Sequence, residues 1–265
     1  MKKIIDQEQP FRQAQDLMNA GELEKALPLI KKAIEINDTM AGPHVLLGHY
    51  YNKNGNPELA LKSYTNAIER NLQWAVPYFQ AAQCLLQLGK KEEGLNLLRQ
   101  AVKLDPSLKE AYHLLIDQLL DENKLAESFN LLEEALRHHP TDGKINFMLA
   151  EMINTTIWGT GKILPARILT YLNAAESDGI NPASINRLRG YYYTNAKDWN
   201  NAAKYFKESL KHELDEDTAH NCAACLQKAG HTEEFFQMMF DLHKGLMSGI
   251  LPAQDSKQNE EMNNE

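Results

Sequence analysis

Two consecutive stretches of 34 residues decide the fold, AGPHVLLGHYYNKNGNPELALKSYTNAIERNLQW at 41–74 and AVPYFQAAQCLLQLGKKEEGLNLLRQAVKLDPSL at 75–108. Aligned without a gap, they share small residues at several positions, such as Ala60 over Gly94 and Ala67 over Ala101. The same spacing continues on both sides, at Ala26, Ala60, Gly94 and Ser128, at Ile30, Tyr64, Leu98 and Leu132, and at Ala33, Ala67, Ala101 and Ala135. Residue types that tolerate the left-handed backbone at a helix end recur at Gly21, Gly55, Gly89 and Asn123. The spacing therefore predicts a repeated helix, turn and helix.

The recurring small residues have a physical reason. Two antiparallel helices joined by a short turn cross closely, and alanine or glycine at the crossing lets their backbones approach. The larger residues then fill the space beside the crossing. Pro106 and Pro140 follow the second helix of their repeats and end it, because proline cannot continue a helix.

This pattern of small, glycine, aromatic, alanine and proline positions resembles the tetratricopeptide repeat (TPR), with an unrelated helical bundle as the alternative. The resemblance implies an all-α fold, a right-handed α-α superhelical solenoid of about seven helix-turn-helix repeats over residues 1–250. The boundaries that we assign are 7–40, 41–74, 75–108, 109–142, 143–182, 183–216 and 217–250. In such a solenoid the first helices line a concave surface, and each repeat is stabilised by its neighbours.

Composition excludes several classes of function. The chain has 265 residues and a net charge of -8, so it lacks the basic surface that nucleic-acid binding requires. No apolar run reaches the roughly 20 residues of a bilayer span, and the polar residues after Ile5 do not continue a secretory signal. Three unevenly spaced cysteines do not form a disulfide framework. We therefore expect a cytoplasmic protein without membrane insertion.

The TPR register also predicts a peptide-binding groove, because the fifth and ninth residues of each first helix face the concave surface in that family. The fifth positions are Phe11, Val45, Phe79, His113, Phe147, Arg187 and Asn221, and the ninth are Gln15, His49, Gln83, Asp117, Glu151, Tyr191 and Cys225. Aromatic area and hydrogen-bonding amides suit an extended or helical peptide. The alternative is that the three phenylalanines only pack neighbouring first helices together.

The groove departs from one well-known TPR subclass, which holds the carboxylate-ended tails of chaperones with Lys, Asn and Arg. The first three repeats carry Phe11, Val45 and Phe79 at the fifth position, and Arg12, Leu46 and Gln80 at the sixth. Acidic residues lie near the middle of the predicted inner wall, at Glu110, Asp117, Asp121 and Glu151. A peptide with a basic or neutral centre is favoured, although such charges also occur on any solvated helix face.

Three candidates for chemistry are weak. Cys222 and Cys225 have the spacing of a redox pair or half a zinc site, but they lie inside a predicted helix and lack further ligands. Gly159-Thr-Gly-Lys162 lacks the spacing and the hydroxyl of a phosphate loop. His138 and His139 stand at a predicted helix end, where a cation complements the helix dipole. We expect no cofactor, no metal and no catalysis.

The fifth repeat and the C-terminus depart from the regular pattern. We expect 155–164 to form an extended turn that Trp158 and Ile163 pack down, and a bend or loose junction there. The last helix has a wide apolar arc, whose residues Phe235, Met239, Leu242 and Leu246 we expect to form an interface for self-association or partner docking. Residues 251–265 have the composition of a disordered acidic tail.

The sequence thus predicts a non-catalytic adaptor or scaffold that binds a protein or peptide partner in its groove. A second hypothesis is a regulatory or substrate-recruiting subunit of an enzyme complex, for example with a transferase, or of an envelope or secretion assembly. The fold does not distinguish these functions.

Overall fold

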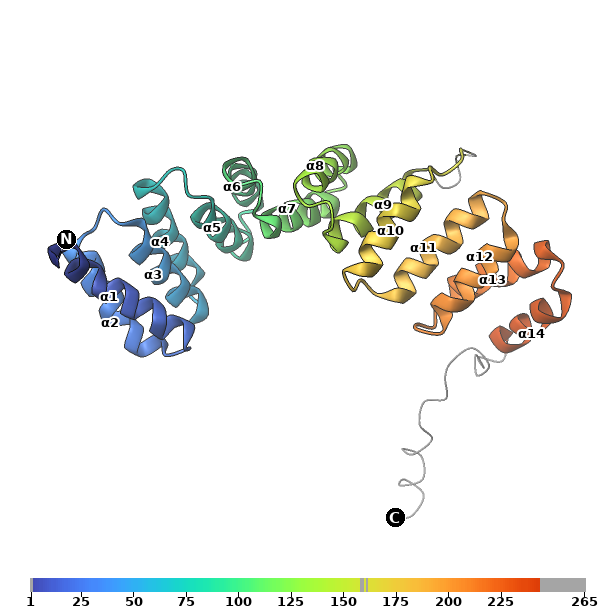
Figure 1. Cartoon of the computed structure of the whole chain (residues 1–265), viewed down its shortest axis with the longest axis horizontal. Helices are drawn as coiled ribbons and strands as arrows, with labels where there is room; N and C mark the ends of the chain where they lie inside the picture. Colours follow the sequence, from blue (N-terminus) through green and yellow to red (C-terminus); the bar gives the residue numbers. More distant parts are fainter. Residues whose placement is uncertain (1, 158–159, 161, 244–265) are drawn as a thin grey trace, which may run out of the picture. The chain divides into compact units, whose positions relative to one another are not determined.

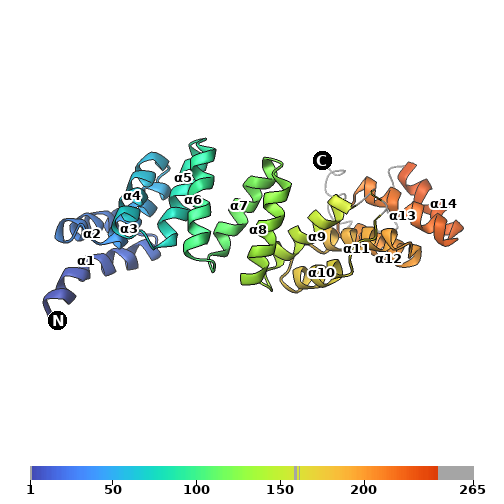
Figure 2. The same ribbon diagram turned by 90° about the horizontal axis from the view of Figure 1, so that it is seen from above.

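A computed structural model describes residues 2–157, 160 and 162–243, and every regular element in these ranges is an α-helix. The helices follow one another as pairs along the chain (Figures 1 and 2). The pairs are α1 (Lys2–Asn19) with α2 (Leu23–Ile36), α3 (Ala41–Lys53) with α4 (Pro57–Arg70), α5 (Ala75–Gln87) with α6 (Lys91–Leu104), α7 (Lys109–Asp121) with α8 (Leu125–His138), α9 (Gly143–Ile157) with α10 (Arg167–Ser177), α11 (Pro182–Asn195) with α12 (Trp199–Leu210), and α13 (Glu216–Ala229) with α14 (Thr232–His243).

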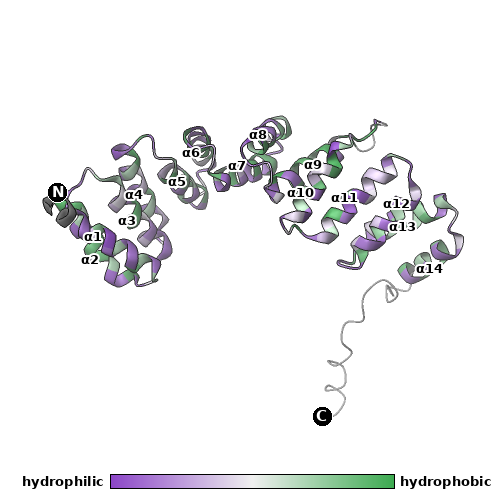
Figure 3. Cartoon of the chain, in the orientation of Figure 1, coloured by the Kyte–Doolittle hydropathy of each residue, from purple (hydrophilic) through white to green (hydrophobic). Residues whose placement is uncertain are grey.

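The turns within the pairs have the predicted backbone. Gly55, between α3 and α4, has φ of 70°, and Asn123, at the equivalent place between α7 and α8, has φ of 56°. This left-handed conformation ends the first helix and reverses the chain within three residues. Along each helix, hydrophobic and hydrophilic residues alternate in short groups, as in amphipathic helices (Figure 3).

In two of the helix pairs, a glycine of the first helix lies in close contact with an aromatic ring of the second. A Cβ atom added to Gly48 of α3 would lie 2.4 Å from Cε1 of Tyr64 on α4, and one added to Gly190 of α11 would lie 2.5 Å from the Phe206 ring of α12. Tyr64 and Phe206 are fully buried. The large side chain of the second helix therefore occupies the space that a small residue of the first helix leaves.

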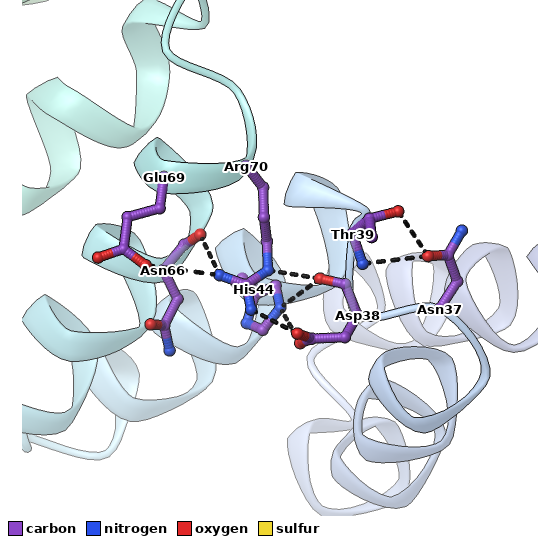
Figure 4. A network of polar contacts seen from close by, with 7 residues as sticks. All are labelled: Asn37, Asp38, Thr39, His44, Asn66, Glu69 and Arg70. Atoms are coloured by element: carbon purple, nitrogen blue, oxygen red, sulfur yellow. Dashed lines mark hydrogen bonds and ion pairs between the residues drawn. The ribbon is translucent and has the colours of Figure 1, made fainter.

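The chain divides into two compact halves, residues 1–131 and 132–265, and each is described by itself. In the N-terminal half, a polar network holds the segment between α2 and α3 to the end of α4 (Figure 4). Asp38 accepts a hydrogen bond of 2.6 Å from Nη2 of Arg70 and lies 3.0 Å from Nε2 of the buried His44. Arg70 also donates to the backbone oxygens of Asp38 and Asn66. The hydrogen bond and charge of Arg70 lower the pKa of the Asp38 carboxyl.

In the C-terminal half, a buried arginine joins α10 to α11. Arg189 is 8% exposed, and its guanidinium makes two hydrogen bonds to the Glu176 carboxylate, at 2.7 and 3.2 Å, and one of 2.7 Å to Asn173. The hydrogen bond from Arg189 lowers the pKa of Glu176. A bidentate pair of this kind fixes the relative position of the two helices.

The lengthened fifth repeat differs from the sequence-based expectation. α9 continues to Ile157, and the segment before α10 is fastened to α11, because Asn195 accepts a 2.7 Å hydrogen bond from the Leu164 N–H and donates to the Lys162 carbonyl. Leu164 is buried while Ile163 is 82% exposed. The prediction that Ile163 packs this segment down is wrong, since successive side chains of extended backbone point in opposite directions and Leu164 takes the inward place. Trp158 lies outside the described residues, and the bend stays a prediction.

A substitution at the glycine of the second repeat tests the steric rule. Gly48→Ala should lower the free energy of unfolding, because overpacking against Tyr64 costs about 1–3 kcal/mol and outweighs the gain in helix propensity of about 1 kcal/mol. Adding Tyr64→Leu should reduce this penalty, since the third repeat carries Ala82 and Leu98 at the same positions. Chemical denaturation of the two single variants and the double variant gives the coupling energy. Strictly additive effects would contradict the rule.

Candidate functional site

The residues predicted to line a groove differ in accessibility. Gln15 and Glu151 are exposed. Partly buried are Phe11, His49, Gln83, His113, Asp117, Phe147, Arg187 and Tyr191. Val45 and Phe79 are 4% and 9% exposed, so neither offers appreciable area to a ligand.

Packing between first helices accounts for part of the predicted aromatic stripe. The Phe11 ring lies against the start of α3, where a Cβ atom on Gly42 would be 2.7 Å from Cζ of Phe11. Phe11 also packs on the core that contains Ala14 and Leu46. These contacts and the burial of Phe79 support the packing alternative for Phe11 and Phe79. For Phe147, which is partly buried, the groove position stays a prediction.

The thiols have no environment for chemistry. Cys222 and Cys225 are 0% and 2% exposed. Burial raises the pKa of Cys222 to about 12 and that of Cys84 to about 11, and it also raises the pKa of Cys225. Within the described residues no three His, Cys, Asp or Glu side chains form a group that could hold a metal. The glycines of the Gly159–Lys162 segment lie outside the described residues.

A pocket of about 490 Å³ lies in the C-terminal half, lined by Asn154, Thr155, Tyr191, Asp217, His220 and Asn221. These residues come from α9, α11 and α13, the first helices of three successive repeats. Of the predicted groove positions, the structure brings Tyr191 and Asn221 together here, with Asn221 Nδ2 3.5 Å from the Tyr191 hydroxyl. Side chains of three successive first helices thus line one open pocket.

Four of the lining residues were missed by the sequence analysis. α9 has 15 residues, whereas α3, α5 and α7 have 13, so its inner face continues past Glu151 to Asn154 and Thr155. In the seventh repeat the left-handed Gly230 comes one residue early, which moves the register back by one. That shift buries Cys225, which was expected in the groove, and brings His220 to the fifth position. A search for helix length and turn spacing would have found both changes.

Asn154 is an unusual member of the pocket wall. Asn154 is 6% exposed, and its carboxamide oxygen is enclosed and has no hydrogen-bond partner among the residues that the structure describes. Leaving a buried acceptor unpaired costs about 1–3 kcal/mol. A residue that lowers stability and lines a pocket is a common feature of binding sites.

The pocket carries negative charge. Asp217 has no ion-pair partner in the part of the chain that the structure describes, whereas Asp215 lies 3.8 Å from Arg187. Burial raises the pKa of Tyr191. The charge of Arg187 opposes this rise, and the charges of Asp215 and Asp217 add to it. His220 lies beside them, with Nδ1 2.8 Å from the Glu216 carbonyl.

The described part of the chain contains no helix with both the length and the apolar character needed to cross a membrane. A cytoplasmic location stays a prediction.

Replacing Asn154 by leucine separates stability from function at this site. Asn154→Leu should raise the free energy of unfolding by about 1 kcal/mol, because an apolar group of similar shape removes the unpaired buried oxygen. Urea denaturation of the full chain measures this change. Asn146→Leu is the matched control, since Asn146 is equally buried on the same helix but donates to the Pro140 and Asp142 carbonyls, so its loss should destabilise. Destabilisation by Asn154→Leu would show that Asn154 is needed for the fold.

Comparison with known proteins agrees with this architecture. The tetratricopeptide repeat model matches residues 41–73 and 75–108. Among solved structures, PilF of Pseudomonas aeruginosa is 21% identical over 80% of this chain and 93% of its own, with a TM-score of 0.61. YrrB, a TPR protein with an unusual peptide-binding site, is 17% identical over 71% and 94%, with a TM-score of 0.57. PilW, a type IV pilus biogenesis factor, is 16% identical over 77% and 92%, with a TM-score of 0.50.

No curated protein matches the sequence. The predicted all-α TPR fold class is confirmed by the helix pairs, the repeat matches and the solved structures together. Residues 41–73 and 75–108 are therefore tetratricopeptide repeats, and the chain has the fold of proteins built from such repeats.

Proposed function

We propose that the chain is a non-catalytic adaptor that binds a segment of a partner protein in the pocket formed by α9, α11 and α13. The observation that carries this proposal is the pocket itself, in which polar side chains of three successive first helices and the Tyr191 ring lie together. The fold shared with YrrB, which has a peptide-binding site, supports this function.

The lining side chains suit a polypeptide ligand. The Asn221 side-chain oxygen can accept a hydrogen bond from an N–H group of an extended backbone, because its NH₂ group already donates within the protein. Tyr191 adds an aromatic ring that is partly buried and thus held in place against Phe206, with the ring centroids 5.3 Å apart. Rigid aromatic and amide groups bind with little loss of side-chain entropy.

A second hypothesis is that the adaptor recruits a substrate or a subunit to a larger assembly. The fold that the chain shares with PilW, a type IV pilus biogenesis factor, is compatible with an assembly role. Both hypotheses use the same pocket, and the identity of the bound partner distinguishes them.

Peptide display against the full chain tests the adaptor function. Selection from a random 12-residue library should enrich peptides whose affinity falls about tenfold or more in Asn221→Ala and in Tyr191→Ala, because each removes a contact in the pocket. Gln100→Ala, an exposed position on α6, is the control and should bind normally. Failure to enrich any peptide, or peptides insensitive to both pocket variants, would contradict the proposal.

We also propose that the exposed face of α14 mediates self-association. Phe236 is 64% exposed and Met239 38%, whereas Met238 is buried and the predicted interface residues Phe235 and Leu242 pack on the core with Cys222 and Leu226. The apolar arc thus divides into an inner part and an outer part. Leu246 lies outside the described residues.

Light scattering over a concentration series tests this second proposal. The wild-type mass should rise with concentration, and Phe236→Glu or Met239→Glu should hold it at the monomer value, because a buried charge in the interface is strongly unfavourable. Gln227→Glu, at an exposed polar position of α13, should behave as wild type. A wild type that stays monomeric at all concentrations would disprove it.

A further inference from the structure

We propose that the pocket between α9, α11 and α13 takes a basic side chain, lysine or arginine, of the bound partner. This inference rests on the proposed function and adds the chemistry of the residue that the pocket selects.

The pocket offers mainly hydrogen-bond acceptors. The Asp217 carboxylate can only accept, whereas the Asn154 oxygen is enclosed and has no hydrogen-bond partner among the described residues. Asn221 uses its NH₂ group within the protein, donating at 2.8 Å to the Asp217 carbonyl, which leaves its side-chain oxygen as the group for a ligand. Lysine brings three N–H donors and arginine five, with no acceptor on either. A basic side chain therefore matches this set better than a second amide does.

The Asn154 oxygen is enclosed, so contact with a ligand requires the carboxamide to turn about its last side-chain bond. This rotation is easy for asparagine, since terminal amide torsions are broad and roughly two-fold. Turning exchanges the places of the oxygen and the nitrogen, so the oxygen faces the pocket only when the NH₂ group takes the enclosed place.

The charges around the pocket favour a cation. No lysine or arginine lines it. Asp217 has no cationic partner in the described ranges, and the nearby Arg187 is paired with Asp215 at 3.8 Å. Glu151, one turn before Thr155 on α9, is exposed and adds further negative charge. A carboxylate or phosphate ligand would meet the Asp217 charge, and the nearby Arg187 is already paired with Asp215.

Size and surface also fit a long side chain. A volume of about 490 Å³ exceeds what one ordered water fills, about 30 Å³, and accommodates a lysine or arginine with part of its own backbone. The apolar stem of such a side chain can lie along the Tyr191 ring while its charged end reaches the acceptors. Aromatic and acidic groups together are a known combination for holding cations.

The direct test uses small probes and the full chain labelled with ¹⁵N. N-acetyl-arginine methylamide and N-acetyl-lysine methylamide should cause saturable shifts of the Asn154 and Asn221 side-chain amide signals. The neutral counterparts of these probes are built on citrulline and norleucine. Their affinity should be lower by about tenfold or more, because the charge-assisted hydrogen bonds are lost. Equal binding of the charged and neutral probes, or shifts confined to residues outside the pocket, would overturn the inference.

Two variants make the test specific to the pocket charge. Asp217→Asn keeps the shape and should weaken binding of the arginine probe about fivefold, the upper range for a largely exposed pair. Glu233→Gln makes the same change of net charge on α14, which does not line the pocket, and should leave binding unaltered. A similar loss in both variants would indicate non-specific attraction to an acidic protein and would overturn the inference.

The two proposals fail in different ways. If display yields pocket-binding peptides that tolerate replacement of every Lys and Arg by norleucine and citrulline, the adaptor function stands and the basic specificity is wrong. If the arginine probe binds as described but no peptide is enriched, the pocket is a cation site and the adaptor function is wrong.

Discussion

Each helix pair depends on how closely its two helices can approach at their crossing. Tyr64 and Phe206 fit because Gly48 and Gly190 carry no Cβ atom. The first and third repeats carry alanine opposite isoleucine or leucine at these positions, whereas the fourth buries Ile116 opposite Leu132. An aromatic ring on the second helix therefore needs glycine on the first, and a smaller aliphatic side chain does not. This explains why the sequence repeats in its pattern of sizes more faithfully than in its residues.

Once the crossing is filled, the remaining face of each first helix determines what the protein can bind. In the N-terminal half this face is used for packing, as with Phe11 on Gly42. In the C-terminal half, two irregularities open a pocket: α9 is extended by half a turn, and the turn at Gly230 shifts α13 by one residue. The candidate site therefore lies where the repeat departs from its own rule, which is common for functional sites.

The sequence predicted the helix pairs because small residues, left-handed turn residues and prolines act locally and recur in phase. It predicted the site less well. Whether Phe79 is buried or exposed depends on its contacts with a neighbouring helix, which its position in the repeat does not reveal. Tyr191 was expected in the groove and lines the pocket. Asn154 was missed, because a sequence does not reveal that a buried side-chain oxygen lacks a hydrogen-bond partner among the described residues. The prediction for Ile163 was wrong because the Leu164 N–H donates to the Asn195 side chain. This contact from a distant helix places Leu164, and not Ile163, on the inner side.

The burial of the three thiols has a practical consequence for labelling. Cys84, Cys222 and Cys225 are at most 2% exposed, and their raised pKa values keep them protonated at neutral pH. Alkylating reagents attack the thiolate and need access to it, so the folded chain is effectively silent toward maleimides. A single cysteine introduced at the exposed Thr155, on the rim of the pocket, can therefore carry a fluorophore while all three native cysteines stay in place.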